Sequence, residues 1–175
     1  MNDKLTQLCN DSINSVTKAG YFILLYENFL NQCKEITRFP YCDFASATFD
    51  DPFPITDKTK QQEHSKRLSK AKDKDAVSYK STSVFYVCFE ENYLAYDEYV
   101  DLKQITQVRN KYVHELDKSI FLDDTSDLDK STLRLIQIRK AFTQKKYELL
   151  EDIDEPVESV LDDFLEMIYT MISAQ

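Results

Sequence analysis

Apolar residues recur along this chain at the three- and four-residue spacing that is typical of amphipathic α-helices. The spacing predicts one long helix or two stacked helices over about residues 3–37, and single helices over about 79–97, 99–120 and 133–150. A further helix begins at Pro156, a residue suited to the first helical position. The last helix carries the clearest apolar stripe, formed by Val157, Val160, Leu161, Phe164, Ile168 and Met171. The pattern therefore predicts an all-α fold, a helical bundle of about five to six helices.

Three details of these helices need a separate interpretation. Gly20 marks either a kink or a close helix contact within the first helix. Asp127 or Asp129 is available as a cap for the helix over 133–150. Residues 77–89 are β-branched and aromatic enough to form a strand, but no second strand is evident to pair with it, which favours a helix.

The region of about residues 38–75 breaks the helical pattern. Residues 38–56 are a predicted loop with three prolines, and its five aromatic side chains indicate that it packs down against the rest of the chain. Residues 57–75 are polar and rich in lysine, which fits either a solvated helix or a mobile arm. We find no other boundary and no repeat, so residues 1–175 are predicted to form a single domain.

The glycine content excludes several classes of function. The 175 residues include one glycine, where an average usage of about 7% would give roughly a dozen. Glycine-rich phosphate loops and dinucleotide fingerprints need several glycines at fixed offsets, so both kinds of site are excluded. A β-sandwich or barrel needs many tight turns, which one glycine and four prolines hardly supply.

The net charge of −9 argues against nucleic-acid binding by the chain as a whole, but the charge is unevenly spread. Residues 58–80 hold eight of the 22 basic residues and three acidic ones, whereas residues 148–166 hold nine acidic residues and no basic one. The basic stretch is more often a solvated helix face than an RNA-binding arm, and we expect His64 within it to be a solvated surface residue. The acidic stretch is expected to be a solvated face or a docking face for a basic partner.

Cysteine usage and apolar stretches bear on the location of the protein. The four cysteines, Cys9, Cys33, Cys42 and Cys88, form no CxxC pair and match no zinc spacing, so we expect reduced and mostly buried thiols. The first residues lack a basic segment followed by an apolar run, and the longest apolar stretches are far too short for a bilayer of about 30 Å. We therefore expect a cytoplasmic protein with no membrane partner.

One string, VRNKYVHEL at residues 108–116, carries the candidate chemistry and one of the two histidines of the chain. A neutral imidazole can take a proton from a hydroxyl or return one to a leaving group. A guanidinium stays charged and presents a fork that suits two phosphate oxygens. Arg109 and His114 are therefore a sufficient minimal set for metal-free phosphodiester cleavage, in which the imidazole activates a ribose 2′-hydroxyl and the guanidinium stabilises the charge on the phosphoryl oxygens.

Helix geometry indicates that one copy of the chain assembles this pair poorly. At about 100° per residue, Arg109 and His114 lie roughly 140° apart around a regular helix. Asn110, His114 and Lys118 share one face, whereas Arg109 lies at the edge of the apolar stripe. A dimer that brings two such helices together around a dyad would place two arginines and two histidines in one cleft.

The pattern Arg109-Asn110-x3-His114, in a predicted helix of a small, acidic, all-helical chain, resembles the R-polar-x3-H signature of the HEPN superfamily. The resemblance implies a helical bundle, commonly a homodimer, that acts as a metal-independent endoribonuclease in a toxin–antitoxin, abortive-infection or other anti-phage system. It implies a composite catalytic site of Arg109 and His114 from both protomers, with Asn110 supporting their placement. It implies no cofactor, and its partners are an RNA substrate, a second copy and an antitoxin or another defence-system protein.

The resemblance covers six residues directly, and the helical order of the chain more loosely. In the HEPN toxins that are paired with a nucleotidyltransferase, a tyrosine stands two residues after the histidine, where this chain has Leu116. We therefore do not extend adenylylation by such a partner to this protein. The weaker candidates for RNA contacts are the basic residues Lys111 and Lys118 beside the motif, and Lys66, Arg67 and Lys70 in the basic stretch.

Three other interpretations of the motif compete with the nuclease. His114-Glu115 does not continue into a zinc-binding HExxH pattern, because Lys118 stands where the second histidine is needed. A HEPN-fold protein without catalysis would serve as an antitoxin, immunity or scaffold protein, and the acidic C-terminal third favours this alternative because acidic surfaces bind basic proteins. The third interpretation is a helical domain with no link to RNA, in which the pattern is a coincidence.

Overall fold

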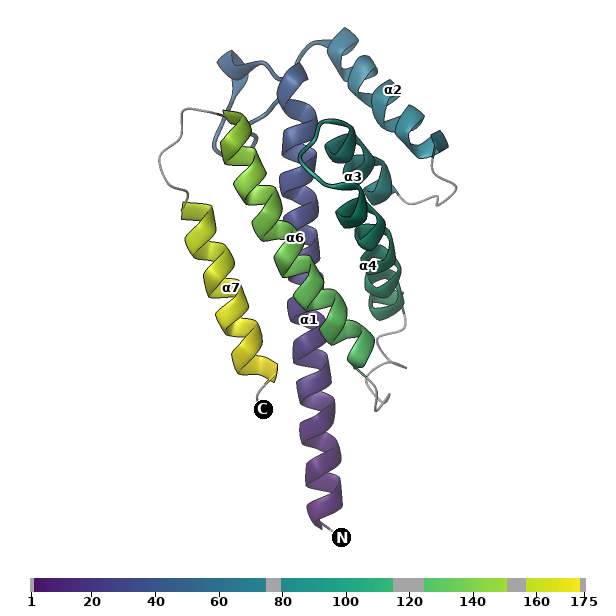
Figure 1. The fold of residues 1–175 in the computed structure, drawn as a ribbon, viewed down its shortest axis with the longest axis vertical. Coiled ribbons are helices and arrows are strands. Elements are labelled where there is room, and N and C mark those ends of the chain that lie inside the picture. Colours follow the sequence, from purple (N-terminus) through teal and green to yellow (C-terminus); the bar gives the residue numbers. More distant parts are fainter. Residues whose placement is uncertain (1, 75–79, 115–124, 151–156, 174–175) are drawn as a thin grey trace. The chain divides into compact units, whose positions relative to one another are not determined.

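The computed structural model describes residues 2–74, 80–114, 125–150 and 157–173. Within these ranges it contains six α-helices, two short 3₁₀ helices and no strand, which confirms the predicted all-α fold (Figure 1). The helices are α1 (Asn2–Arg38), α2 (Lys58–Lys74), α3 (Lys80–Glu90), α4 (Tyr96–His114), α6 (Ser126–Leu150) and α7 (Val157–Ser173). The 3₁₀ helices η1 (Phe39–Tyr41) and η2 (Phe44–Ser46) lie in the predicted loop.

The chain divides into two compact units. Unit 1 consists of residues 1–27 and 104–175, and unit 2 consists of residues 28–103. Both α1 and α4 cross the boundary, so each of these helices contributes residues to both units.

Residues 3–37, predicted as one long helix or two stacked helices, form the single helix α1, which extends one residue further at each end. Its buried apolar side chains are Ala19, Phe22, Leu25, Tyr26, Phe29, Leu30, Cys33 and Ile36, and Thr37 is buried as well. Apart from its chain neighbours and the backbone of its own helix, nothing lies within 4 Å of the point where a Cβ would stand at Gly20, and the residue is exposed, so the proposed close helix contact at Gly20 is wrong. Glycine is therefore not required there by packing.

Unit 1 is held together by contacts of α1 with α6 and α7. The hydroxyl of Tyr21 on α1 donates to the main-chain oxygen of Leu165 on α7, and its ring stacks on Tyr169 at 6.0 Å between centroids. Tyr169 in turn donates to Oδ1 of Asp129 on α6 at 2.7 Å. Lys18 of α1 lies 3.4 Å from the same carboxylate. Asp129 is therefore a shared anchor for all three helices.

The packed face of α7 differs from the predicted apolar stripe. Phe164 and Met171 are 50% and 62% exposed, whereas Tyr169 is 4% exposed. The buried line of α7 therefore passes through Tyr169, whose hydroxyl bonds Asp129, and Phe164 and Met171 lie outside it. The side chains of Val157, Val160 and Leu161 lie outside the described residues, as does Pro156.

The helix predicted over 79–97 is two helices, α3 and the start of α4, separated by a turn. Asn92 adopts a left-handed conformation with φ of 64°, which stops α3. The N–H of Asn92 donates to the oxygen of Phe89, and that of Tyr93 donates to the oxygen of Cys88. These two bonds form a Schellman motif, which satisfies the last carbonyls of the helix.

The next helix begins with a side-chain cap. The carboxylate of Glu98 accepts from the N–H of Ala95 at 2.7 Å, while the oxygen of Ala95 accepts from the N–H of Tyr99 at 3.0 Å. This arrangement is one half of a capping box, and it fixes the start of α4. The rest of α4 agrees with the predicted helix over 99–120 as far as His114, and the remainder of that range lies outside the described residues.

The helix predicted over 133–150 begins earlier, at Ser126. Thr125 occupies the capping position: its oxygen accepts from the N–H of Asp129 at 2.9 Å, and its hydroxyl lies 3.4 Å from Oδ2 of Asp129. The proposed caps Asp127 and Asp129 are therefore wrong, because both residues lie within the first turn of α6. Acidic side chains there favour the helix through its dipole.

Unit 2 resolves the alternatives left open for residues 57–89. Lys58–Lys74 is a helix, α2, that packs against α3, and its Ala71 is buried. Residues 80–89, which could have formed a strand, lie in α3, which confirms the preference for a helix.

Three of the four cysteines are buried and Cys9 is exposed, and all four are free thiols. Burial, together with the neighbouring thiol of Cys88, raises the pKa of Cys33.

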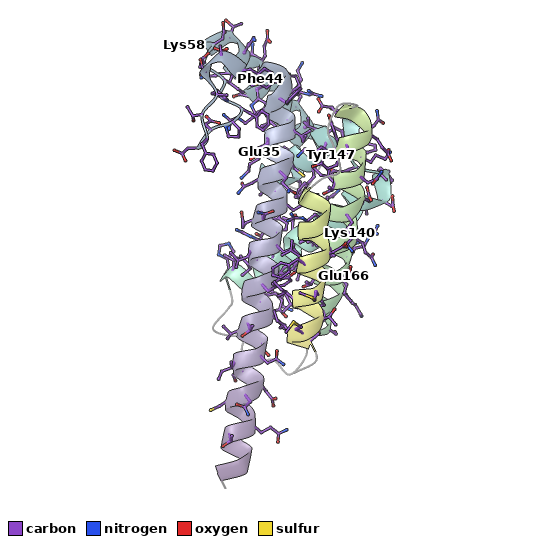
Figure 2. All side chains as sticks on the ribbon, turned by 90° about the vertical axis from the view of Figure 1, so that its left-hand side faces the viewer. Glu35, Phe44, Lys58, Lys140, Tyr147 and Glu166 are labelled. Carbon is purple, nitrogen blue, oxygen red and sulfur yellow. The ribbon has the colours of Figure 1, made fainter. Side chains whose placement is uncertain are left out.

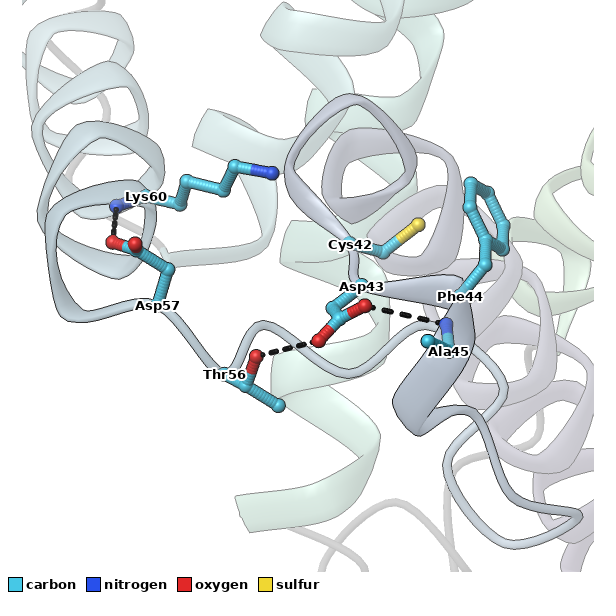
Figure 3. Close-up of a pocket in the computed structure, with 7 residues that line it drawn as sticks. All are labelled: Cys42, Asp43, Phe44, Ala45, Thr56, Asp57 and Lys60. Carbon is cyan, nitrogen blue, oxygen red and sulfur yellow. Dashed lines mark hydrogen bonds between the residues drawn. The ribbon is translucent and has the colours of Figure 1, made fainter.

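The loop before α2 is organised by two aspartates. Asp43 accepts from the N–H of Ala45 at 3.2 Å and from the hydroxyl of Thr56 at 3.0 Å (Figure 3). It also accepts from the hydroxyl of Ser46 at 3.0 Å. Asp57 caps α2 by accepting from the N–H of Lys60 at 3.1 Å. The hydrogen bond from Ser46, followed by that from Thr56, lowers the pKa of Asp43.

The predicted packing of the loop aromatics holds in part. The ring of Phe39 lies against Phe44 at 5.3 Å and Phe53 at 5.8 Å between centroids. Phe49 is 99% exposed, so this aromatic does not pack down.

Candidate functional site

Arg109 is held in place by three neighbours within unit 1. Its guanidinium forms an ion pair with the carboxylate of Glu27 on α1. Nη1 donates to the amide oxygen of Asn110 at 3.1 Å, and the guanidinium carbon lies 5.8 Å from the centroid of the Tyr26 ring. The side chain is 26% exposed. The guanidinium therefore has a defined position and still contacts solvent.

The ring beneath Arg109 is itself fixed. Tyr26 is 1% exposed, and its hydroxyl shares a hydrogen bond of 2.9 Å with that of Thr106 on α4. This bond joins α1 to α4 one turn before Arg109. Since Glu27 follows Tyr26 directly, the same turn of α1 supplies both the ring and the carboxylate that hold the guanidinium.

One nitrogen of Arg109 remains unused. Nε is buried and has no hydrogen-bond partner among the described residues. A buried donor without an acceptor costs about 1–3 kcal/mol, and because Nε is buried, a ligand would contact the exposed part of the guanidinium instead. Phosphate and carboxylate oxygens are the acceptors that a guanidinium binds best.

His114 is the last residue of α4 and its side chain is exposed. The helix runs unbroken from Arg109 to His114, so the two side chains project about 140° apart, as expected for five residues of regular helix. Figure 1 shows α4 as one continuous helix to its end. The structure thus brings Asn110 to Arg109 but does not bring His114 to Arg109 within one copy.

The basic residues proposed for RNA contacts divide between the two units. In unit 1, Lys111 is exposed, with Nζ 5.7 Å from the centroid of the Tyr112 ring, and Lys118 lies outside the described residues. In unit 2, Lys66 and Lys70 are exposed on α2. Arg67, also on α2, forms an ion pair with Glu91. Arg67 is therefore already engaged by a carboxylate within unit 2.

Sequence reasoning missed Glu27 and Tyr26, the two residues that hold Arg109. A signal for Glu27 is present, because it is the one charged residue between positions 21 and 30, in the most apolar part of α1. A carboxylate in such a setting needs a cationic partner. The sequence does not say which of the 22 basic residues that partner is.

His64 is not the solvated surface residue that the sequence predicted. Its ring lies 5.5 Å from that of Tyr41 between centroids, and its Nε2 is 3.4 Å from the hydroxyl of Thr37. Burial lowers the pKa of His64, and the positive charges of Arg38 and Arg67 lower it further. The second histidine of the chain is therefore a half-buried residue in a basic environment.

Part of the acidic stretch is used within unit 1. Lys140 of α6 forms ion pairs with Asp163, at 2.9 Å, and with Glu166 of α7. Figure 2 shows Lys140 and Glu166 beside each other on these neighbouring helices. The hydrogen bonds that Lys140 donates to Glu166 and Asp163 raise its pKa. These two carboxylates therefore stabilise the packing of α7 on α6.

No family model, curated protein or solved structure matches the chain. The likeness to the HEPN superfamily therefore rests on the six residues from Arg109 to His114 and on their position in a helical fold. Within the described ranges, no helix is long and apolar enough to cross a membrane. The same residues contain no group of three or more metal-ligating side chains close enough to share an ion.

Proposed function

We propose that this protein is a metal-independent endoribonuclease of the HEPN type, in which Arg109 and His114 of two copies form one composite site. The observation that carries the proposal is the fixed guanidinium of Arg109, which is held by Glu27 and Asn110 and still contacts solvent. An ordered arginine with unused donor capacity is suited to phosphoryl oxygens. The resemblance implies a role in a toxin–antitoxin or abortive-infection system.

In this proposal the chemistry divides between the two residue types. The imidazole of His114 from one copy takes the proton of a ribose 2′-hydroxyl, and the resulting oxygen attacks the adjacent phosphorus. The bond from phosphorus to the 5′-oxygen breaks, this oxygen leaves with a proton donated by the protonated imidazole of the second copy, and a 2′,3′-cyclic phosphate remains. Arg109 stabilises the negative charge that grows on the non-bridging oxygens. Asn110, which binds Nη1, keeps the fork of the guanidinium in one orientation.

Two exposed apolar side chains support association near this site. Leu24 is 72% exposed and lies one turn before Glu27 on α1, and Val113 is 37% exposed and lies one turn after Arg109 on α4. Apolar side chains beside an ion pair are a suitable centre for an interface with a second copy. Such a contact would bring the two α4 helices together and supply the His114 that each Arg109 lacks.

A binding module of the same fold, without catalysis, is the second candidate. The observation that favours it is the ion pair itself, because Glu27 neutralises the guanidinium that catalysis needs. In this case the protein acts as an antitoxin, immunity or scaffold partner. Substitution of His114 or Arg109 would then change partner binding no more than substitution of other surface residues.

The deciding experiment compares RNA cleavage by the wild type, His114→Ala and Gln107→Ala, all in EDTA. Gln107 is exposed on α4 and serves as the matched control. We expect cleavage by the wild type and Gln107→Ala and none by His114→Ala. In cells, expression of the wild type would arrest growth and expression of His114→Ala would not. A folded His114→Ala variant that cleaves like the wild type would contradict the nuclease, and absence of cleavage by the wild-type dimer would favour the binding module.

A further inference from the structure

A second feature of the molecule, an open cavity in unit 2, has no part in the proposed nuclease. It lies between the C-terminal end of α1, the middle of α2 and the start of α3, and it encloses about 590 Å³. Cavities that hold small ligands span about 300–1,000 Å³. Nine residues from these three helices line it.

The lining is positively charged in a protein that is acidic as a whole. Lys34 and Arg38 are one turn apart on α1, and none of the nine lining residues carries a carboxylate. Asp51 binds Arg38 from outside the lining set, through Nη2 alone, at 3.0 Å and 3.2 Å. This contact orients the guanidinium and offsets part of its charge, and it leaves the N–H groups of Nε and Nη1 to donate to a ligand.

Hydroxyl groups and apolar side chains complete the lining. Ser65 and Ser69 lie one turn apart on α2, and Ser83 of α3 is 5% exposed. Leu68 and Val84 supply an apolar surface on the same cavity. Hydroxyl donors beside two cations suit an anionic oxygen group, and the apolar surface suits an organic substituent attached to it.

His64 adds a proton-dependent donor to this set. The hydroxyl of Thr37 donates to the oxygen of Lys34 at 2.9 Å, so toward His64 it acts as the acceptor of Nε2–H. The neutral ring then has an acceptor at Nδ1, which becomes a donor when the ring is protonated. An anion bound in the cavity would favour that protonation, since it offsets the positive charges that oppose it.

We propose that this cavity is a binding site for a small phosphate monoester. Arg38 and Lys34 contact the phosphate oxygens, the serine hydroxyls donate to them, and the organic group lies against Leu68 and Val84. The cavity at Asp43 in Figure 3 is a poorer candidate for an anion, because Asp43 and Asp57 both line it. The phosphate-ester site does not include Arg109 or His114, so a result that contradicts the proposed nuclease leaves this proposal unchanged, and the reverse also holds.

The test is titration calorimetry of the full chain at pH 7 with adenosine monophosphate, and separately with inorganic phosphate. We expect saturable binding of both, tighter for the monophosphate because its organic group gains the apolar contact. Lys34→Gln and Arg38→Gln should each weaken binding at least tenfold. Ser69→Leu, which fills the cavity from an exposed position on α2, should abolish it.

The matched control is Lys66→Gln, which removes the same charge from an exposed position on α2 outside the cavity. Binding should be unchanged in this variant. Melting temperatures establish that each variant is folded, and Lys34, which is exposed, is the variant least able to disturb the fold. The proposal is overturned if neither compound binds the wild type at millimolar concentrations, or if Lys66→Gln weakens binding as much as Lys34→Gln.

Discussion

Arg109 of α4 and Glu27 of α1 form an ion pair across 82 positions of the sequence. Both side chains keep contact with solvent, with exposures of 26% and 38%, so the pair is worth no more than about 1 kcal/mol of folding free energy. Its larger effect is on the guanidinium, which Glu27 both orients and neutralises. These two effects act in opposite directions on an anionic substrate.

The first prediction separates orientation from neutralisation. Glu27→Gln keeps a carbonyl oxygen as acceptor for Arg109 and removes the competing charge. We expect KM for RNA to fall several-fold at low salt, because the phosphate no longer competes with a carboxylate. The free energy of unfolding should fall by less than about 1 kcal/mol. The control is Asp11→Asn, which removes one negative charge from an exposed position on α1. An equal change of KM in both variants would show a general charge effect and contradict the prediction.

The second prediction uses the different burial of the two motif residues. His114→Ala should lower the cleavage rate by about 10²–10⁴-fold and leave the melting temperature unchanged, because the side chain is exposed. Arg109→Ala should lower the rate by a similar factor and also lower the melting temperature, since it removes the contacts with Glu27 and Tyr26. Cleavage assays and thermal unfolding measure both. Equal melting temperatures for the two variants would mean that the ion pair contributes nothing to stability.

A third prediction concerns assembly. We expect light scattering to show a homodimer, and Leu24→Glu to convert it to a monomer without RNA cleavage. Leu24 is 72% exposed, so the substitution should not destabilise the monomer. Phe164→Glu is the control, because Phe164 is an exposed apolar residue on another helix of unit 1. A wild-type protein that is monomeric at micromolar concentration and cleaves RNA would contradict the composite site.

How far the sequence predicts this fold depends on the kind of signal. The helical spacing of apolar residues predicted α1, α4, α6 and α7, because a helix that buries one face carries apolar residues at that spacing. The segment that forms α2 is polar, so its sequence did not distinguish a solvated helix from a mobile arm. Apolar spacing continues across the break between α3 and α4, so the pattern did not predict that break. Its cause is local: a left-handed Asn92 and the capping carboxylate of Glu98. Asn92, followed six residues later by Glu98, is a weak sequence signal for the end of one helix and the start of the next.

The candidate site was predictable to a smaller extent. The six-residue pattern named Arg109, Asn110 and His114, and the structure joins the first two by a hydrogen bond. The contact of Arg109 with Glu27 depends on how α1 and α4 pack, which no local pattern encodes. The environment of His64 was missed for the same reason, since Thr37 and Tyr41 reach it from other segments.

The fourth prediction follows from the environment of His64. Its pKa in the folded protein lies below the ordinary value of 6.5, because of burial and the charges of Arg38 and Arg67. Between that folded pKa and about 6.5, the unfolded chain binds a proton that the folded chain does not. The free energy of unfolding should therefore decrease as the pH falls from about 7 through this window, and stop decreasing below the folded pKa.

Urea unfolding at a series of pH values measures this effect, with His64→Asn as the comparison. The groups that face His64 are Thr37 and Arg38 of α1, Tyr41 of η1 and Arg67 of α2, and none of them is a histidine or a carboxylate. The variant should therefore lose the part of the pH dependence that His64 contributes. Identical pH profiles for the two proteins would contradict the lowered pKa.

The division of the chain between the two units has a consequence for synthesis on the ribosome. Unit 2 is one uninterrupted stretch, residues 28–103, whereas unit 1 needs residues from both sides of it. Ala19, Phe22 and Leu25 of α1 leave the exit tunnel long before α6 and α7 have been translated. Unit 2 can therefore fold while residues 1–27 of unit 1 still expose their apolar face. During that interval these exposed apolar side chains can form non-native contacts or aggregate. Correct folding of unit 1 therefore requires that they stay uncovered, for example by binding a chaperone, until α6 and α7 have been translated.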